Sequence, residues 1–197
     1  VESVRARLRR EGLDAATAES AATAVRRRLK AEVSSYVDSL RGLRFPSIDA
    51  AHDAVKSREK VLCYVAATWP AGFGDGRPLT FVVDQEDAEA LLRQIDEMIV
   101  DAEVPLRTTV RSLAASREIS TSDVQALRGF SRMRATARAR NAIEEIRGAP
   151  FFSKQDARFY VENALAAELE GILSAMRDPA TRDSILERAR SRDGIGS

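Results

Sequence analysis

Residues 122–147 read SDVQALRGFSRMRATARARNAIEEIR, a stretch without proline and with one glycine. Ser122, or Ser120 before it, can cap the start of a helix here, and Gly148-Ala149-Pro150 ends it. Apolar side chains recur at helical spacing, and the candidate inner positions are Val124, Leu127, Phe130, Met133, Ala137 and Ile143. The pattern predicts one long helix that carries an unusual number of arginines.

Helical patterns also flank this stretch on both sides. They cover Asp14–Leu40, Ser47–Thr68, Asp84–Pro105, Lys154–Met176 and a short final segment to Arg192. Glycine and proline predict a loop over Trp69–Pro78, and Leu79–Val83 is a short β-prone run. We predict that Leu106–Ser120 is a connection between two of the helices.

These elements predict an all-α protein. Four principal helices with a short strand element favour an antiparallel four-helix bundle. The expected organisation is an N-terminal helical arm over residues 1–30, a bundle core over 31–152 and a C-terminal helical arm over 153–197.

Composition excludes several classes of protein. The chain has 44% hydrophobic and 31% charged residues, which is ordinary for a globular domain. One cysteine, Cys63, and one histidine, His52, cannot form an internal disulfide or a cysteine–histidine zinc cage. No apolar run reaches membrane-spanning length and the N-terminus lacks a secretory pattern, so we expect neither a membrane partner nor secretion. We expect no catalytic residues, no metal and no cofactor.

The net charge of +1 conceals a division along the chain. Residues 61–105 carry two arginines against nine acidic residues, whereas residues 106–148 carry nine arginines against four acids. Arginines on several sides of one helix exceed what the acids of that helix can neutralise. They therefore indicate a polyanion such as nucleic acid, ion pairs between subunits, or a solvated surface.

Several short motifs occur together in a fixed order. They are LRGLRF at 40–45, KSREKVLCYVAA at 56–67, Trp69-Pro70, FVVD at 81–84, IEEIRG at 143–148 and FFSK at 151–154. In this order the chain resembles the coat proteins of rod-shaped RNA viruses of the tobacco mosaic, tobacco rattle and barley stripe mosaic type. The resemblance covers about residues 33–160, and the C-terminal arm beyond Tyr160 is longer than is usual in that family.

The resemblance implies a non-enzymatic capsid protein that polymerises helically around single-stranded genomic RNA. Its place would be the virion, and the host cytoplasm during assembly. The RNA-binding residues carried over by position are Arg58, Arg107, Arg111, Ser122, Asp123, Arg128 and Arg132. Asp123 has the alternative role of a helix cap.

Carboxylates that repel one another across subunits are known in that family. Glu97, Asp101 and Glu103 are the residues that would take this role here. Two other classes of function stay open from the sequence: a small helical nucleic-acid-binding regulator that acts as a closed dimer, and an enzyme with a carboxylate-based site.

Overall fold

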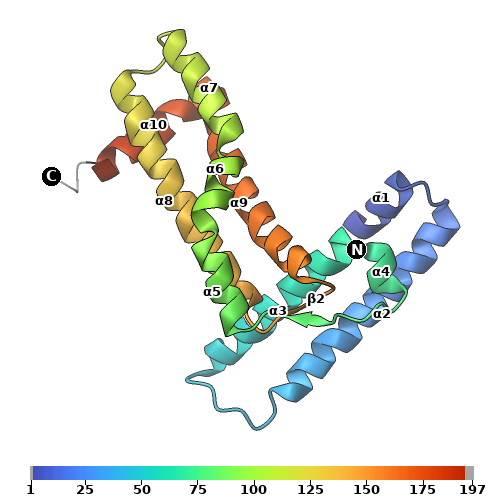
Figure 1. Cartoon of the computed structure of the whole chain (residues 1–197). Helices are drawn as coiled ribbons and strands as arrows, with labels where there is room; N and C mark the ends of the chain where they lie inside the picture. Colours follow the sequence, from blue (N-terminus) through green and yellow to red (C-terminus); the bar gives the residue numbers. More distant parts are fainter. Residues whose placement is uncertain (1, 194–197) are drawn as a thin grey trace. The chain divides into compact units, whose positions relative to one another are not determined.

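The computed structural model describes residues 2–193 and is mostly helical (Figure 1). The all-α class is therefore confirmed. The helices of this range are α1 Glu2–Arg10, α2 Ala15–Ser39, α3 Ile48–Thr68, α4 Pro70–Gly74, α5 Gln85–Arg93, α6 Ile95–Ala102, α7 Val104–Ala115, α8 Thr121–Ile146, α9 Lys154–Arg177 and α10 Pro179–Asp193. Two strands, β1 Phe81–Val82 and β2 Pro150–Phe151, accompany them.

The chain divides into two compact units. Unit 1 holds the residues up to Gln85 together with Glu145–Ala157, and unit 2 holds Glu86–Glu144 together with the residues from Arg158 onward. The predicted division into an arm, a core and a second arm stays a prediction. Its outermost residues, 1 and 194–197, lie outside the described part of the chain.

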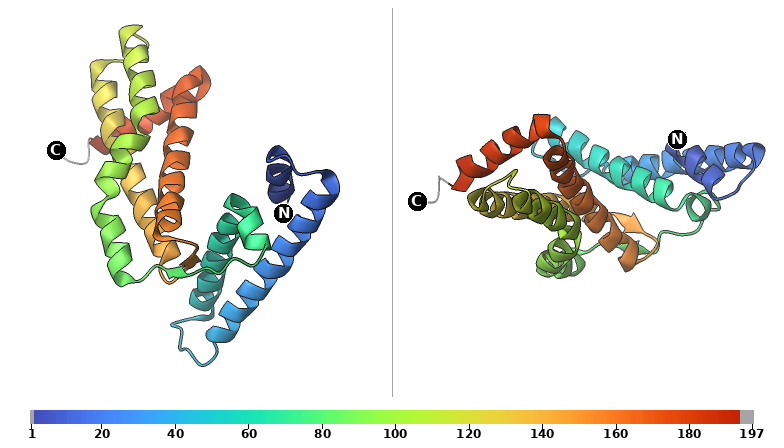
Figure 2. Two further views of the ribbon diagram at one scale, coloured as in Figure 1. Left: turned by 45° about the vertical axis from the view of Figure 1, so that its right-hand side comes forward. Right: turned by 90° about the horizontal axis from the view of Figure 1, so that it is seen from above.

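Unit 1 is built on the antiparallel pair α2 and α3, which lie side by side (Figure 2). The sequence predicted both helices, and their caps explain where they begin. The Asp14 carboxylate accepts hydrogen bonds from the backbone amides of Ala16 and Thr17 at the start of α2. The Ser47 hydroxyl accepts one from the amide of Ala50 at the start of α3.

The segment predicted as a loop over Trp69–Pro78 contains the short helix α4, so that prediction was wrong in part. Proline at the first helical position is compatible with a helix, because its missing N–H would have no partner there. α4 buries Phe73 completely. The Arg28 guanidinium lies 4.5 Å from the centre of that ring and donates to the Phe73 carbonyl at 2.7 Å.

The β-prone run forms a strand only over Phe81–Val82, and its partner comes from far along the chain. β1 pairs with β2 in antiparallel register, with Phe81 opposite Phe151. Gly148 turns the chain between α8 and β2 with a φ of 68°, a conformation that favours glycine. This small sheet joins the end of α8 to the segment after α4 within unit 1.

Unit 2 consists of helices that run back and forth (Figure 1). α5, α6 and α7 follow one another in one direction, α8 returns, α9 runs back beside it, and α10 crosses the far end. The helix predicted over Asp84–Pro105 is interrupted at Gln94, which separates α5 from α6.

The prediction that Leu106–Ser120 is a connection was wrong, because most of it is helix α7. Pro105 lies in the first turn of this helix, where proline is accommodated. Only residues 116–120 connect α7 to α8.

α8 confirms the long arginine-rich helix, but its inner face differs from the predicted one. Leu127, Phe130 and Ile143 are buried as expected, whereas Met133 and Ala137 are exposed. Between Phe130 and Ile143 the buried positions are Ser131 and three alanines, Ala135, Ala139 and Ala142. Small side chains allow neighbouring helices to pack closely. The alanines therefore face inward here, and the larger Met133 lies on the exposed side. No helix of residues 2–193 is long and apolar enough to cross a membrane.

Replacing Phe73 by alanine should destabilise unit 1. The change empties a fully buried ring site and removes the surface on which Arg28 stacks, so we expect the free energy of unfolding to fall by about 3–5 kcal/mol. Urea unfolding followed by circular dichroism measures this. Val82→Ala, at a half-exposed strand position, is the control and should change it by less than about 0.5 kcal/mol; equal effects of the two changes would contradict the assignment of Phe73 to the core.

Candidate nucleic-acid interface

A cavity of about 160 Å³ lies between α7 and α8, entirely within unit 2. Three of the predicted RNA-binding arginines face it: Arg107 and Arg111 from α7, and Arg128 from α8. The remaining lining residues are Glu103, Leu106, Val110, Val124, Leu127 and Ser131. The structure therefore brings together three residues that the sequence placed in separate elements, and we call this cavity the arginine pocket.

Helical spacing explains why these side chains share one pocket. On the α7 side, residues 103, 106, 107, 110 and 111 follow the three- and four-residue intervals of one helix face. On the α8 side, residues 124, 127, 128 and 131 do the same. Each stripe has an apolar part that packs inward and an arginine part at the edge, so the pocket has an apolar floor and a cationic rim.

The guanidinium groups of the rim differ in how they are held. Arg107 is half-buried and donates to the carbonyl oxygen of Val100 at 2.5 Å. Arg111 and Arg128 are exposed, and neither guanidinium has an ion pair or hydrogen bond to another residue of the described chain. Two unneutralised arginines that flank an apolar hollow are suited to an anionic ligand with a flat apolar part.

Glu103 adds an acceptor to this cationic pocket. Its side chain is buried, with 7% of the residue exposed, and its Oε1 atom has no hydrogen-bond partner in the structure. A buried carboxylate oxygen without a donor is costly, because the group gives up its water without receiving a replacement. A ligand that brings an N–H or O–H donor into the pocket would satisfy Glu103.

Asp123 is engaged at the start of α8 rather than in the pocket. Its carboxylate accepts from the backbone amide of Ser120 at 2.9 Å, while the Ser120 hydroxyl accepts from the amide of Asp123 at 3.1 Å. This reciprocal arrangement is a capping box, so Ser120 is the residue that caps α8. Asp123 completes this cap as the partner of Ser120, so its geometry supports the alternative, capping role.

The same carboxylate also binds an arginine of the C-terminal helix. Arg190 Nε lies 2.6 Å from Asp123 Oδ1, and the aspartate side chain is only 6% exposed. The hydrogen bond from Arg190, with those from Ser120, lowers the pKa of Asp123 to about 2 against the opposing effect of burial. The carboxylate is therefore ionised throughout the neutral range.

Two more of the predicted RNA-binding residues have partners within unit 2. The Ser122 hydroxyl lies 2.8 Å from that of Ser120. Arg132 forms an ion pair with Asp96 of α6 at 2.7 Å, between exposed side chains. Neither residue lines the arginine pocket.

Arg58 belongs to unit 1 and also does not line the pocket. Its guanidinium donates to the Gly148 carbonyl at 2.5 Å and lies 4.2 Å from the centre of the Tyr36 ring. Burial lowers the pKa of this arginine. In the single chain Arg58 thus joins α3 to α2 and to the turn that precedes β2.

The three predicted intersubunit carboxylates divide into two kinds. Glu97 and Asp101 are exposed on α6. The hydrogen bond to Glu162 raises the pKa of Arg158 on α9, and the charges of Glu97 and Asp101 add to this effect. Glu103 is buried in the arginine pocket. Among the described residues, no three histidine, cysteine, aspartate or glutamate side chains are grouped so that they could hold a metal ion.

Sequence reasoning missed α7 as an element, the buried position of Glu103, and the two arginines of α10 that bind acids near the pocket, Arg182 and Arg190. A signal for α7 was present. Leu106, Val110 and Leu113 recur at helical spacing after Val104-Pro105. The pairing of α10 with residues sixty positions earlier has no local signal.

Comparison with protein-family models, with curated proteins and with solved structures found no match to this chain.

Replacing Asp123 by asparagine should make the protein less stable at neutral pH. The folded-state pKa of about 2 lies below the ordinary value of 3.8, so the carboxylate stabilises the fold above pH 3.8 and this contribution is lost as the pH falls through 2. We expect the variant to be about 2 kcal/mol less stable near pH 6, with the difference shrinking below pH 4.

Urea unfolding at a series of pH values measures this difference. Asp96→Asn is the matched control, because Asp96 is 78% exposed in its ion pair and should contribute less than about 0.5 kcal/mol. A stability difference for Asp123→Asn that does not depend on pH would show that the charge of Asp123 is not what stabilises α8.

Proposed function

We propose that this chain is a viral coat protein that assembles helically into rod-shaped particles and encapsidates single-stranded RNA through arginine–phosphate contacts. The observation that carries the proposal is the convergence of Arg107, Arg111 and Arg128 on one pocket between two helices. The protein would be located in the virion and would assemble in the host cytoplasm. It would have no catalytic activity.

The composition of the pocket fits a nucleotide better than a simple anion. Phosphate oxygens would accept hydrogen bonds from Arg111 and Arg128, whose charges are not neutralised within the described chain. The ribose and base carry O–H and N–H donors that would satisfy the buried Oε1 of Glu103. The apolar floor, which includes Leu106 and Leu127, offers a surface for the face of a base.

The contacts of the pocket predict little sequence preference. Phosphate contacts fix the position of a strand without reading its bases. An apolar floor with an arginine rim can accept any base, because every base has a flat face that can stack. A coat protein that covers a whole genome needs this lack of preference.

Exposed apolar side chains support assembly into a polymer. Leu43 and Ile48 are exposed at the turn between α2 and α3, and Val100 and Val104 are exposed where α6 meets α7. Contacts between different surfaces of identical subunits build open helical arrays when the rotation does not close. These apolar positions would be covered by neighbouring copies in such an array.

The antiparallel four-helix bundle of the coat subunit is part of this proposal. The antiparallel pair α2 and α3 within unit 1, and the opposite courses of α5–α6 and α8 within unit 2, support it (Figure 1).

Electron microscopy of the purified full chain mixed with single-stranded RNA tests the function directly. We expect rods that contain RNA, detected by the ratio of nucleic-acid to protein absorbance in the pelleted particles. Small discrete particles without nucleic acid at every salt concentration and pH would favour the closed-dimer regulator instead.

Removing the rim charges tests the site. Arg111→Ala with Arg128→Ala should weaken RNA binding by about tenfold or more, and should reduce the salt dependence by about 0.7 in log–log slope for each lost phosphate contact. Fluorescence anisotropy titrations at several salt concentrations measure both quantities. Neither side chain is buried, so the variant should remain folded.

Arg93→Ala with Arg140→Ala is the matched control, since it removes the same charge from exposed positions outside the pocket. We expect this control to retain most of the affinity. If both double variants lose affinity equally, RNA binding depends on net charge and not on the arginine pocket.

A further inference from the structure

The connection between α7 and α8 is held at two points by the C-terminal helix α10. Arg182 Nη1 lies 2.5 Å from Glu118 Oε2, and Arg190 Nε lies 2.6 Å from Asp123 Oδ1. Glu118 lies in the connection itself, and Asp123 lies in the first turn of α8. The acid of the connection and the acid of the first turn of α8 therefore both bind an arginine from the same distant helix.

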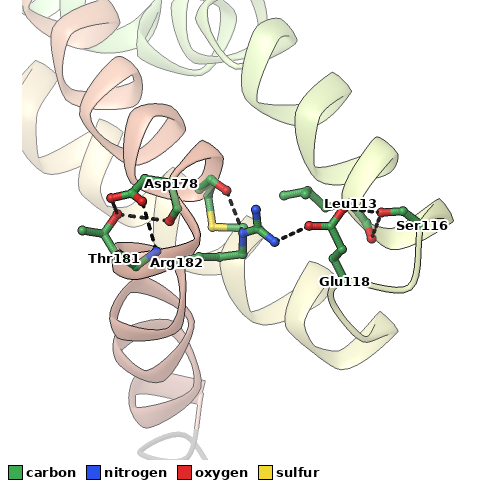
Figure 3. Close-up of polar contacts among 8 residues, drawn as sticks. Leu113, Ser116, Glu118, Asp178, Thr181 and Arg182 are labelled. Carbon is green, nitrogen blue, oxygen red and sulfur yellow. Dashed lines mark hydrogen bonds and ion pairs between the residues drawn. The ribbon is translucent and has the colours of Figure 1, made fainter.

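The Arg182 side chain is also held by a contact at the junction of α9 and α10 (Figure 3). Its Nε donates to the carbonyl oxygen of Met176, at the end of α9, at 2.9 Å. Its side chain is only 12% exposed. Asp178 caps the start of α10 by accepting from the amide of Ala180 and from the hydroxyl of Thr181. The guanidinium thus bridges the junction of α9 and α10 to the connection after α7.

Glu118 is held by contacts with residues at the end of α7 and just after it (Figure 3). Its Oε1 accepts from the Ser116 hydroxyl at 2.8 Å, and its backbone amide donates to the Leu113 carbonyl at 2.9 Å. Arg117 just before it has a φ of 61°, in the left-handed region that residues with a side chain rarely adopt. The hydrogen bond from Ser116, together with Arg182, lowers the pKa of Glu118.

The connection of residues 116–120 determines the orientation of α7 and α8, the two helices that line the arginine pocket. α7 carries Arg107 and Arg111, α8 carries Arg128, and residues 116–120 are the only covalent link between these helices. A rim that must reach one phosphate from two helices needs that link to be rigid. The two ion pairs also neutralise the acids nearest the link, so these acids do not attract the rim arginines.

We propose that α10 is a positioning element for the arginine pocket, with Arg182 and Arg190 as positioning residues that fix α7 and α8 in the geometry that binds RNA. This inference rests on the proposed function, because it takes RNA as the ligand of the pocket. It gives the long C-terminal arm a role in nucleic-acid binding, although none of its residues lines the pocket.

Charge reversal at Arg182 tests the proposal in the full-length chain. Arg182→Glu places two carboxylates together and should release the connection, so we expect affinity for a fluorescein-labelled oligouridylate to fall by about tenfold at fixed salt. The double variant Arg182→Glu with Glu118→Arg restores an opposite-charge pair and should recover affinity to within about twofold. Arg177→Glu, at an exposed position on α9, is the control with the same change of charge and should bind more tightly than Arg182→Glu.

Thermal unfolding by circular dichroism is measured on every variant, so that affinities are compared only between folded chains. If Arg182→Glu does not fold, Arg190→Gln is measured in its place. The Arg190 side chain is 59% exposed, so removing its charge should destabilise the fold less. The reversed pair has the net charge of the unmodified chain, so an effect of net charge is tested by comparing Arg182→Glu with Arg177→Glu, which carries the same change of charge. Positioning is supported when Arg177→Glu keeps the affinity that Arg182→Glu loses, and equal losses in these two variants would overturn it.

The outcomes separate the two proposals. If the unmodified chain binds oligouridylate and folded Arg182→Glu binds equally well, the positioning role of α10 is wrong and the coat function stands. Failure of the reversed pair to recover would also overturn the positioning role. If the unmodified chain itself binds no oligouridylate at any salt concentration, both proposals fail together.

Discussion

Three guanidinium groups share one small pocket with a single buried carboxylate, and the chemistry of unit 2 depends on this excess of positive charge. This excess of positive charge remains because three acids of unit 2 form ion pairs with other arginines. Asp96 pairs with Arg132, Glu118 pairs with Arg182, and Asp123 pairs with Arg190. In each pair an acid of unit 2 is neutralised by an arginine that does not line the pocket. The rim therefore stays available for a ligand, and a polyanion is the ligand that such a rim favours.

The buried carboxylate is as informative as the arginines. A site for phosphate alone gains nothing from an acid on its wall, because the two would repel each other. Glu103 is nevertheless held in the pocket with one oxygen lacking a donor. A nucleotide resolves this contradiction, since it presents acceptors to the rim and donors to the interior. For this reason we propose a strand of RNA, and not a free anion, as the ligand of the pocket.

Much of this structure could be predicted from local patterns, and what could not has a physical reason. Asp14 and Ser47 marked the starts of α2 and α3 because a cap is a contact between near neighbours. The sequence does not predict helix α7, because Pro105 after an apolar helical run indicates the end of a helix, although proline is also favoured in a first turn. Among the predicted RNA-binding residues, Arg107, Arg111 and Arg128 meet in the pocket, whereas Asp123 and Arg132 have partners on α10 and α6. Such partners depend on tertiary packing, which one sequence does not reveal.

Photochemical cross-linking tests most directly the claim that RNA lies in the pocket between α7 and α8. RNA containing 4-thiouridine would be bound to the full chain, irradiated and digested, and the attached peptides identified by mass spectrometry. We predict that the major cross-links fall within residues 104–131, on the lining of the arginine pocket. Cross-links confined to other segments, or none in an RNA-bound complex, would contradict the claim.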